Sequence, residues 1–329
     1  MDPCLSVRQT AAHVASTASL VTIDDAAIQR LAASLDDVAS IAAGGFDHQL
    51  HYWDAEQPDA VAQYLLVVDA LNFCFWPDAE LEYEQLAGGL RRALLADPRA
   101  LDAGRLAVLD GADVRRLLQW PRPLPLEEER ARLLREVGAA LLDLYGGLAA
   151  NLVRAAGGSA VRLVRLTTAA FPGFRDHCVY GGRQLFFYKR AQIWAGDLYG
   201  CFRGQGLGAF ADIGQLTMFA GERHARSYYR VPVVLRERGI LLYAAPLAAA
   251  VDGGRELAAG GCEEVEIRGC TIAAVERLRD ALAARLEGEG RGAEAAQLCS
   301  VKLDWWLWEE GERDLHRHRP HHRTLTVYY

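Results

Sequence analysis

The sequence lacks any cysteine or histidine pattern typical of a structural metal site or a disulfide framework. Its seven cysteines are odd in number and scattered, with no C-x-x-C pair. Such sites need paired cysteines at short spacing. Four histidines cluster near the C-terminus without the H-E-x-x-H spacing of a zinc helix, at His316, His318, His321 and His322. We therefore expect no metal, and no zinc or disulfide scaffold.

Long apolar runs and an excess of positive charge are also missing. No apolar run approaches the ~18 residues that would span a bilayer. The first ten residues, MDPCLSVRQT, lack the basic start and apolar stretch of a secretion signal. With 36 basic and 43 acidic side chains the net charge is −7, which disfavours binding to nucleic acid. We expect a cytoplasmic protein with neither a membrane nor a nucleic acid as partner.

The common nucleotide and ester motifs are absent as well. There is no G-x-x-x-x-G-K-[ST] and no G-x-S-x-G. Gly204, Gly206 and Gly208 alternate in a loop that no strong strand precedes, unlike a dinucleotide-binding turn. These absences disfavour ATP hydrolysis, hydride transfer and serine-ester chemistry.

The sequence does show helical periodicity along most of its length. Apolar residues at strides of three and four predict helices at 59–75, from Asp24 onward, after the acidic residues 127–129, at 264–286 and at 293–310. Residues 178–180 and 184–188 predict a hairpin around Gly181-Gly182. We expect a mostly α fold, with an N-terminal segment at 1–23 and one helical domain at 24–329 that is not divided at Pro121–Pro125.

The segment LCSVKLDWWLWE combines tryptophans with acids. At about 100° per residue, its apolar residues form one helix face, made of Leu298, Val301, Trp305 and Trp308. Asp304 and Glu309 lie at the two edges of this face. Carboxylates beside buried indoles are costly to desolvate unless something pairs with them. Either an arginine of a neighbouring helix or a ligand rich in hydrogen-bond donors meets that need.

Two further features are open to two interpretations. Lys189 and Arg190 lie where a helix starts, which suits either a phosphate group or solvated surface charge. Asn72 falls on the apolar face of the 59–75 helix, so its amide must be paired, either by the backbone or by a ligand.

Several long strings, rich in rare residues and in a consistent order from about Asp24 to Tyr329, resemble the queuosine salvage protein family. They are LNFCFW (71–76), FPGFRD (171–176), FYKRAQI (187–193) followed by Asp197, LTMFA (216–220), YRVP (229–232), EEVEIRGCTI (263–272), LDWWLWE (303–309) and the final Tyr328-Tyr329.

This resemblance implies hydrolysis of the N-glycosidic bond of queuosine 5′-phosphate, with release of queuine and ribose 5-phosphate. It also implies a helical fold similar to helix-hairpin-helix DNA glycosylases, and no cofactor. The family's base-binding residues match His51 (with His48 as the alternative), Phe219, and the set Asp304, Trp305 and Glu309. Lys189 or Arg190 would meet the 5′-phosphate.

The sequence departs from the family at the catalytic aspartate. In the family motif F-A-D-Y-R this acid lies two residues after the phenylalanine, and counting forward from Phe219 leads to Gly221. Counting back from Arg230, taken as the arginine of the motif, leads to Tyr228. Neither residue is a carboxylate. Glu222 is the nearest carboxylate, so we expect it to act beside the anomeric carbon. The alternative is a protein that binds queuine or its nucleotide without cleaving it.

Overall fold

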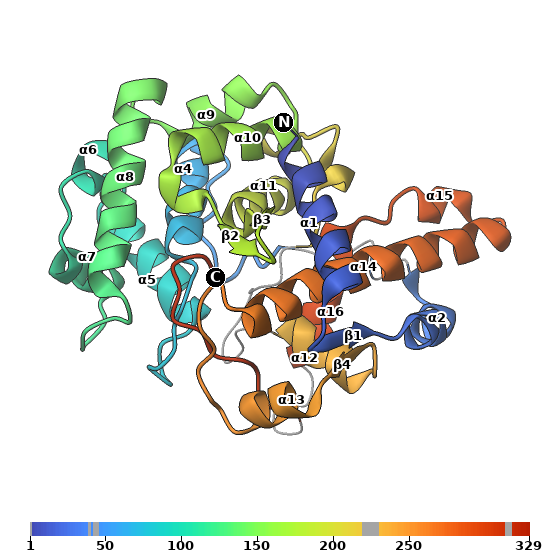
Figure 1. The fold of residues 1–329 in the computed structure, drawn as a ribbon. Helices are drawn as coiled ribbons and strands as arrows, with labels where there is room; N and C mark the ends of the chain where they lie inside the picture. Colours follow the sequence, from blue (N-terminus) through green and yellow to red (C-terminus); the bar gives the residue numbers. More distant parts are fainter. Residues whose placement is uncertain (1, 39–40, 42–45, 219–229, 313–317) are drawn as a thin grey trace.

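The computed structural model describes residues 2–38, 41, 46–218, 230–312 and 318–329. Its architecture is mostly helical, with two small antiparallel pairs of strands (Figure 1). The predicted fold class and the predicted hairpin are therefore confirmed. The expected likeness to helix-hairpin-helix DNA glycosylases stays a prediction.

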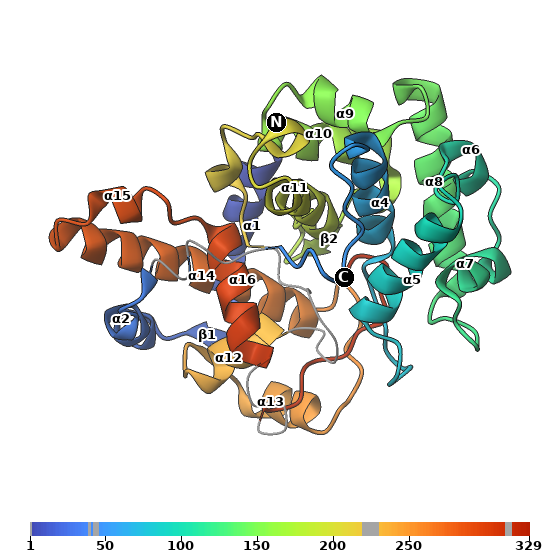
Figure 2. The same cartoon turned by 180° about the vertical axis from the view of Figure 1, so that it is seen from behind.

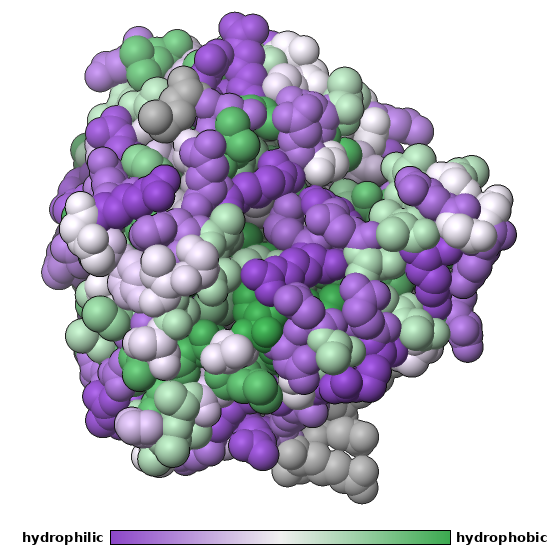
Figure 3. Space-filling model, turned by 45° about the vertical axis from the view of Figure 1, so that its right-hand side comes forward, coloured by the Kyte–Doolittle hydropathy of each residue, from purple (hydrophilic) through white to green (hydrophobic). Residues whose placement is uncertain are grey.

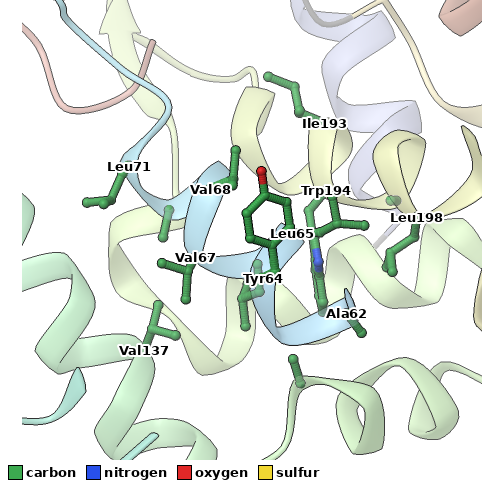
Figure 4. Packing of buried hydrophobic residues seen from close by; sticks show 14 of the residues in the cluster. Ala62, Tyr64, Leu65, Val67, Val68, Leu71, Val137, Ile193, Trp194 and Leu198 are labelled. Carbon is green, nitrogen blue, oxygen red and sulfur yellow. The ribbon is translucent and has the colours of Figure 1, made fainter. Parts of the chain in front are cut away.

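One group of helices surrounds a first hydrophobic core, on the left of Figure 1. These helices are α4 (Pro58–Leu71), α5 (Tyr83–Ala96), α6 (Ala103–Leu106), α7 (Gly111–Leu118), α8 (Glu127–Tyr145), α9 (Ala149–Ala156), α10 (Ala160–Ala170) and α11 (Lys189–Cys201). In Figure 4, Tyr64 and Leu65 of α4 lie against Trp194 of α11, while Val67 points toward Val137 of α8. Because α4 is apolar nearly all round, it is buried on all sides.

A second group of helices surrounds a second hydrophobic core. It consists of α1 (Pro3–Thr17), α2 (Asp25–Ser34), α12 (Arg230–Glu237), α13 (Ala245–Asp252), α14 (Cys262–Gly288), α15 (Gly292–Ala295) and α16 (Ser300–Glu312). Helix α1 crosses the long helix α14 (Figure 1), and Gly269 permits this crossing. A Cβ on Gly269 would lie 2.6 Å from Val14 Cβ, closer than side chains pack.

One of the two strand pairs joins parts of the chain that are far apart in sequence, and the other forms a hairpin. Strand β1 (Val21–Ile23) pairs with β4 (Leu241–Tyr243), and β2 (His177–Tyr180) pairs with β3 (Arg183–Phe186). Gly181 and Gly182 both have positive φ, 57° and 75°, as a two-residue hairpin turn requires. The second pair is the hairpin predicted from the sequence, whereas the first pair was not predicted.

Helix boundaries agree with the sequence where a cap is encoded locally. Asp24 caps α2 by accepting the Ala27 N–H at 3.1 Å, and three glutamates occupy the first turn of α8, which ends at Gly146. Short 3₁₀ turns occur at Pro172–Phe174, Gly206–Gly208 and Ile213–Gln215.

Two predicted helices are shorter than expected. Helix α4 ends at Leu71 rather than Phe75, because the buried Arg130 takes up the carbonyls that follow. The helix predicted at 293–310 is divided into α15 and α16. Helix α16 begins at Ser300, whose hydroxyl is bound to Glu276 of α14.

Three features place the site. Helix α11 belongs to the first group and lies near the middle of the molecule in both ribbon views (Figures 1 and 2). Helix α16 packs on α12 and α14 and is well seen from behind in Figure 2. The C-terminal segment 318–329 runs from the α13 side to the end of α4, where the Cys74 N–H donates to the Tyr329 carbonyl at 3.0 Å.

On the face drawn in Figure 3, hydrophobic surface gathers in the middle, between hydrophilic regions on both sides. Within the described ranges, no single helix has the length and apolar character needed to cross a membrane; the bent pair α8 and α9 meets that criterion only when taken together.

Candidate active site

Helix α16 places Asp304 and Trp305 inside the protein. Val301 and Trp305 belong to the first hydrophobic core, whereas Leu303 and Leu307 belong to the second. Asp304 lies between these two faces and only 2% of its surface is exposed. A carboxylate accepts hydrogen bonds from donor groups, so the position of Asp304 beside Trp305 suits recognition of a polar ring edge.

The predicted single apolar face of this segment is wrong in part. Leu298 precedes the helix, and Trp308 is only half-buried. Because α16 lies between two cores, its Leu303 and Leu307 face is buried too. Glu309 is exposed, so the two acids predicted at the edges of one face occupy different environments.

His51 lies in a cage of aromatic side chains. Its Nδ1 is 3.3 Å from the Tyr64 hydroxyl and its Nε2 is 3.4 Å from the Tyr83 hydroxyl. The Tyr64 hydroxyl donates to the Ala87 carbonyl at 3.0 Å. The Tyr64 oxygen can then accept from Nδ1–H of His51, and Nε2 of His51 can accept from the Tyr83 hydroxyl. The Phe46 ring covers His51 at a centroid distance of 4.3 Å. These contacts fix the orientation of the His51 ring.

His48, the alternative to His51, is half-buried in the same loop. Its ring packs edge-on against Phe46 and Trp53, at centroid distances of 5.3 and 5.5 Å. Phe46 belongs to the same hydrophobic core as Trp305. The loop of both histidines and helix α16 therefore contribute to one apolar cluster, and the choice between the two histidines stays open.

Arg190 is part of the core. Its guanidinium donates to the carbonyls of Ala70 and Gly173 and lies 4.9 Å from the Phe174 ring centroid. Burial lowers the pKa of Arg190 to about 10, so it remains charged at neutral pH. Because main-chain carbonyls use this guanidinium, Arg190 secures the end of α4 and is poorly placed to meet a phosphate.

Lys189, its neighbour, points elsewhere. It is buried in the first turn of α11, and its Nζ lies 5.5 Å from the Tyr329 ring centroid. The backbone here is held by Asp176, whose carboxylate is 3.4 Å from the Lys189 N–H. Of the two predicted phosphate contacts, the structure leaves Lys189 as the stronger candidate.

A buried charge cluster surrounds Tyr329. Arg268 pairs with Asp176 at 2.5 Å and with Glu264 at 3.1 Å, and its guanidinium lies 4.3 Å from the Tyr329 ring centroid. Burial alone would lower the pKa of Arg268, but the two carboxylates raise it above its usual value. Burial raises the pKa of Glu264. This cluster ties α14 to the start of α11.

His322 completes the cluster. Its ring lies 6.3 Å from the Tyr329 ring between centroids. Burial, followed by the nearby charges of His321, Arg268 and Lys189, holds the pKa of His322 well below its usual value. His322 is therefore neutral at pH 7, so it adds no positive charge beside Lys189.

Of the two options for pairing the Asn72 amide, the described structure contradicts the first, pairing by the backbone, and pairing by a ligand stays a prediction. Asn72 is fully buried just after α4, yet neither its amide nitrogen nor its oxygen has a hydrogen-bond partner. Arg130 already binds the carbonyls of Leu71, Phe73 and Cys74 at 2.7 Å each. The backbone that could have paired the amide is thus occupied.

Phe219 and Glu222 lie outside the described residues, so the predictions made for them remain predictions. In the part of the chain that the structure describes, no three His, Cys, Asp or Glu side chains are grouped closely enough to hold a metal ion.

Comparison with known proteins identifies the family. Residues 50–329 match the model of the queuosine salvage protein. The chain is 39% identical to a Dictyostelium discoideum protein over all of both chains, and 42% identical to a Sphaerobacter thermophilus protein over 99% of this chain and 98% of the other. A Mus musculus protein is 35% identical over all of both chains. The chain belongs to the queuosine salvage protein family. Each of these three relatives is named queuosine 5′-phosphate N-glycosylase/hydrolase.

The family match includes polar residues that sequence reasoning about single motifs did not select. Asp176, Glu264 and Arg268 lie in strings that carried the resemblance, FPGFRD and EEVEIRGCTI, but no role was assigned to them. His322 was noted only as part of a histidine cluster without metal spacing. Nothing in local spacing indicates that these four residues meet around Tyr329.

Proposed function

We propose that this queuosine salvage family member hydrolyses the N-glycosidic bond of queuosine 5′-phosphate, releasing queuine and ribose 5-phosphate. The observation that carries the proposal is the similarity, over essentially the full length, to relatives that bear this name. The buried neighbours Asp304 and Trp305 on α16 support it, because an indole can stack on a flat heterocycle and a carboxylate can accept hydrogen bonds from donor groups at its edge.

In this proposal Asp304 binds donor groups of the base and Trp305 stacks on it. His51, or else His48, contacts the base from the loop before α4, and Phe219 stacks from the segment after α11. Lys189 meets the 5′-phosphate, as a cation beside a helix N-terminus is suited to do. Glu309, being exposed, contributes at most an outer contact.

The chemistry requires few groups. The C1′–N bond breaks through an oxocarbenium-like state, a water oxygen adds to C1′, and one proton of that water goes to the departing base. A carboxylate near C1′ stabilises the positive charge or forms a transient bond to the sugar. We assign this carboxylate to Glu222, the acid nearest to the position that the family pattern indicates.

A second function has one observation in its favour, namely that Gly221 occupies the position where the family's acid is expected. Without a carboxylate at C1′ the pocket would bind queuine or its nucleotide without turnover. This alternative predicts affinity but no queuine release.

The experiment is to incubate the purified full-length chain with queuosine 5′-phosphate and measure queuine by chromatography. We expect turnover by the wild type and a loss of about 100-fold or more in kcat for Glu222→Gln. Glu263→Gln, which removes a surface acid paired with Arg255, is the matched control and should leave kcat unchanged.

Measuring queuine binding by calorimetry, beside the turnover assay, distinguishes the hydrolase from the binding protein. Binding without any release by the wild type would support the binding protein. Turnover that Glu222→Gln does not reduce would reject Glu222 as the stabilising carboxylate. Neither binding nor turnover by a folded wild type would reject the proposed function itself.

A further inference from the structure

We propose that Glu276 of helix α14 is a positioning residue that fixes the first turn of α16, and with it Asp304 and Trp305. This inference rests on the proposed function, because it concerns how the two base contacts named there are held. Its basis is a network of hydrogen bonds and ion pairs that joins α1, α14 and α16.

The first step concerns the contact between Glu276 and α16. Ser300 is the first residue of α16 and is fully buried. Its hydroxyl donates to the Glu276 carboxylate. Asp304 follows one helical turn later on the same side of the helix, and a carboxylate beside the first turn also interacts favourably with the helix dipole. The contact therefore fixes the end of α16 that lies nearer to both base contacts.

The second step concerns what holds Glu276 itself. Its other carboxylate oxygen accepts from Arg8 Nε at 2.9 Å and from Arg279 Nη1 at 2.8 Å. The same Arg279 nitrogen lies 3.2 Å from the Ser300 hydroxyl. Because only 13% of the Glu276 side chain is exposed, solvent screens these contacts less than at the surface. Glu276 is thus held from α1 and from its own helix while it holds α16.

The third step concerns the origin of Arg8. Helix α1 packs closely on α14 where Gly269 permits the crossing, so Arg8 reaches Glu276 from a fixed backbone. The Arg8 Nη2 also lies 3.5 Å from the carbonyl oxygen of Leu216, which belongs to the same hydrophobic core as Trp305. The network therefore places the start of α16 relative to the core that its indole enters.

The test separates the base end from the phosphate end in the full-length protein. Glu276→Gln keeps the shape of the side chain and removes its charge, whereas Ser300→Ala removes the hydroxyl on α16. Calorimetry measures the Kd of queuine, which carries no phosphate, and the Kd of ribose 5-phosphate, which carries no base. Asp280→Asn is the matched control, because Asp280 pairs with the same Arg279 at 2.6 Å through a side chain that is 67% exposed.

We expect Glu276→Gln to raise the queuine Kd about fivefold, the size of one hydrogen bond, and Ser300→Ala to raise it about threefold. The ribose 5-phosphate Kd should stay within about twofold in both variants, because Lys189 lies on α11. Asp280→Asn should leave both constants within about twofold. In a Ser300→Ala background, Glu276→Gln should add less than about twofold, because the link to α16 is already gone.

Hydrogen exchange without ligand gives a second measurement. Both variants should speed exchange of the α16 amides at 304–307 about fivefold and leave those of α2 unchanged, since local opening reports the contacts of each element. If Glu276→Gln does not fold, Ser300→Ala, which deletes one oxygen atom, provides the same comparison.

A general structural role would raise the Kd of queuine and of ribose 5-phosphate together, and that result would overturn the inference. So would a folded Glu276→Gln variant with wild-type queuine affinity and wild-type exchange in α16, or additive effects of the two substitutions. A wild type that neither binds nor releases queuine, with faster α16 exchange in the variants, would reject the proposed function and leave Glu276 as the residue that anchors α16.

Discussion

The base end of the proposed site lies on one helix, whereas its phosphate end is assembled from four separate parts of the chain. Asp304 and Trp305 are neighbours on α16, and the two hydrophobic cores bury that helix on opposite faces. Around Tyr329, by contrast, side chains meet from the loop just before β2, from α11, from α14 and from the C-terminal segment. A site on one rigid helix depends on the packing of that helix; an assembled site depends on every contact between its segments.

The difference is sharpest at two consecutive residues. Arg190 turns into the core and binds main-chain carbonyls, while Lys189 turns toward Tyr329. Both are cations at the start of α11, and both are buried. One therefore serves stability and the other, in our proposal, serves binding.

The largest expected effect follows from replacing Arg190 with methionine. Arg190→Met leaves the carbonyls of Ala70 and Gly173 buried without donors, so we expect the free energy of unfolding to fall by about 4 kcal/mol. Urea denaturation followed by circular dichroism measures it. Arg132→Met, which removes an exposed partner of Glu129, should cost less than about 0.5 kcal/mol. Equal losses for the two variants would contradict the assignment of Arg190 to the core.

The next effect is at the base end. Asp304→Asn replaces the buried acceptor by a group of the same shape that also presents donors, and we expect kcat/KM for queuosine 5′-phosphate to fall about 100-fold. Glu310→Gln, one residue past Glu309 and paired with Arg238 at the surface, is the control and should change it less than threefold. A wild-type rate for Asp304→Asn would remove α16 from the site.

A smaller effect concerns pH at the phosphate end. The pKa of His322 is lowered in the folded protein, so the unfolded chain takes up a proton first as the pH falls below about 6.5. Stability is therefore full above this pH and decreases as the pH drops toward the folded pKa.

We expect this histidine to account for a loss of about 1 kcal/mol between pH 7 and pH 5.5. Comparing denaturant unfolding of the wild type and His322→Asn at both pH values measures it. The loss should be absent in His322→Asn and retained in His177→Asn, which changes an exposed histidine. A pH dependence that survives in His322→Asn would show that other groups cause it.

The smallest expected effect is at Glu309. Because this side chain is exposed on α16, Glu309→Gln should change KM for queuosine 5′-phosphate less than threefold. Steady-state kinetics at low and at physiological salt measure it. An effect as large as that of Asp304→Asn would mean that Glu309 turns inward when substrate binds, and that the two acids act together.

Much of the fold follows from local signals. The cap at Asp24, the glutamates at the start of α8 and the Gly-Gly hairpin were predicted, and each is a feature of a few consecutive residues. Helix α1 was missed, although Asp2 caps it and Pro3 starts it. The pairing of β1 with β4 could not be predicted in this way, because the strands are three residues each and far apart in the chain.

The candidate site likewise has a part that the sequence could predict and a part that it could not. The spacing within LDWWLWE was enough to select Asp304 and Trp305, since helical geometry relates residues along one segment. It also placed Glu309 beside them, where the structure shows an exposed side chain, because periodicity does not say which face a second core covers. The roles of Lys189 and Arg190 could not be separated, since a buried cation's direction depends on which carbonyls or rings surround it.

The sequence by itself determined the family, the mostly helical architecture and the acid–indole pair on the last long helix, because long motifs and helical periodicity are properties of consecutive residues. The tertiary structure alone decided that Arg190 secures the end of α4 while Lys189 faces Tyr329, and that Asp176, Arg268 and His322 gather there. The physical reason is that burial and charge pairing arise between segments that only folding brings together.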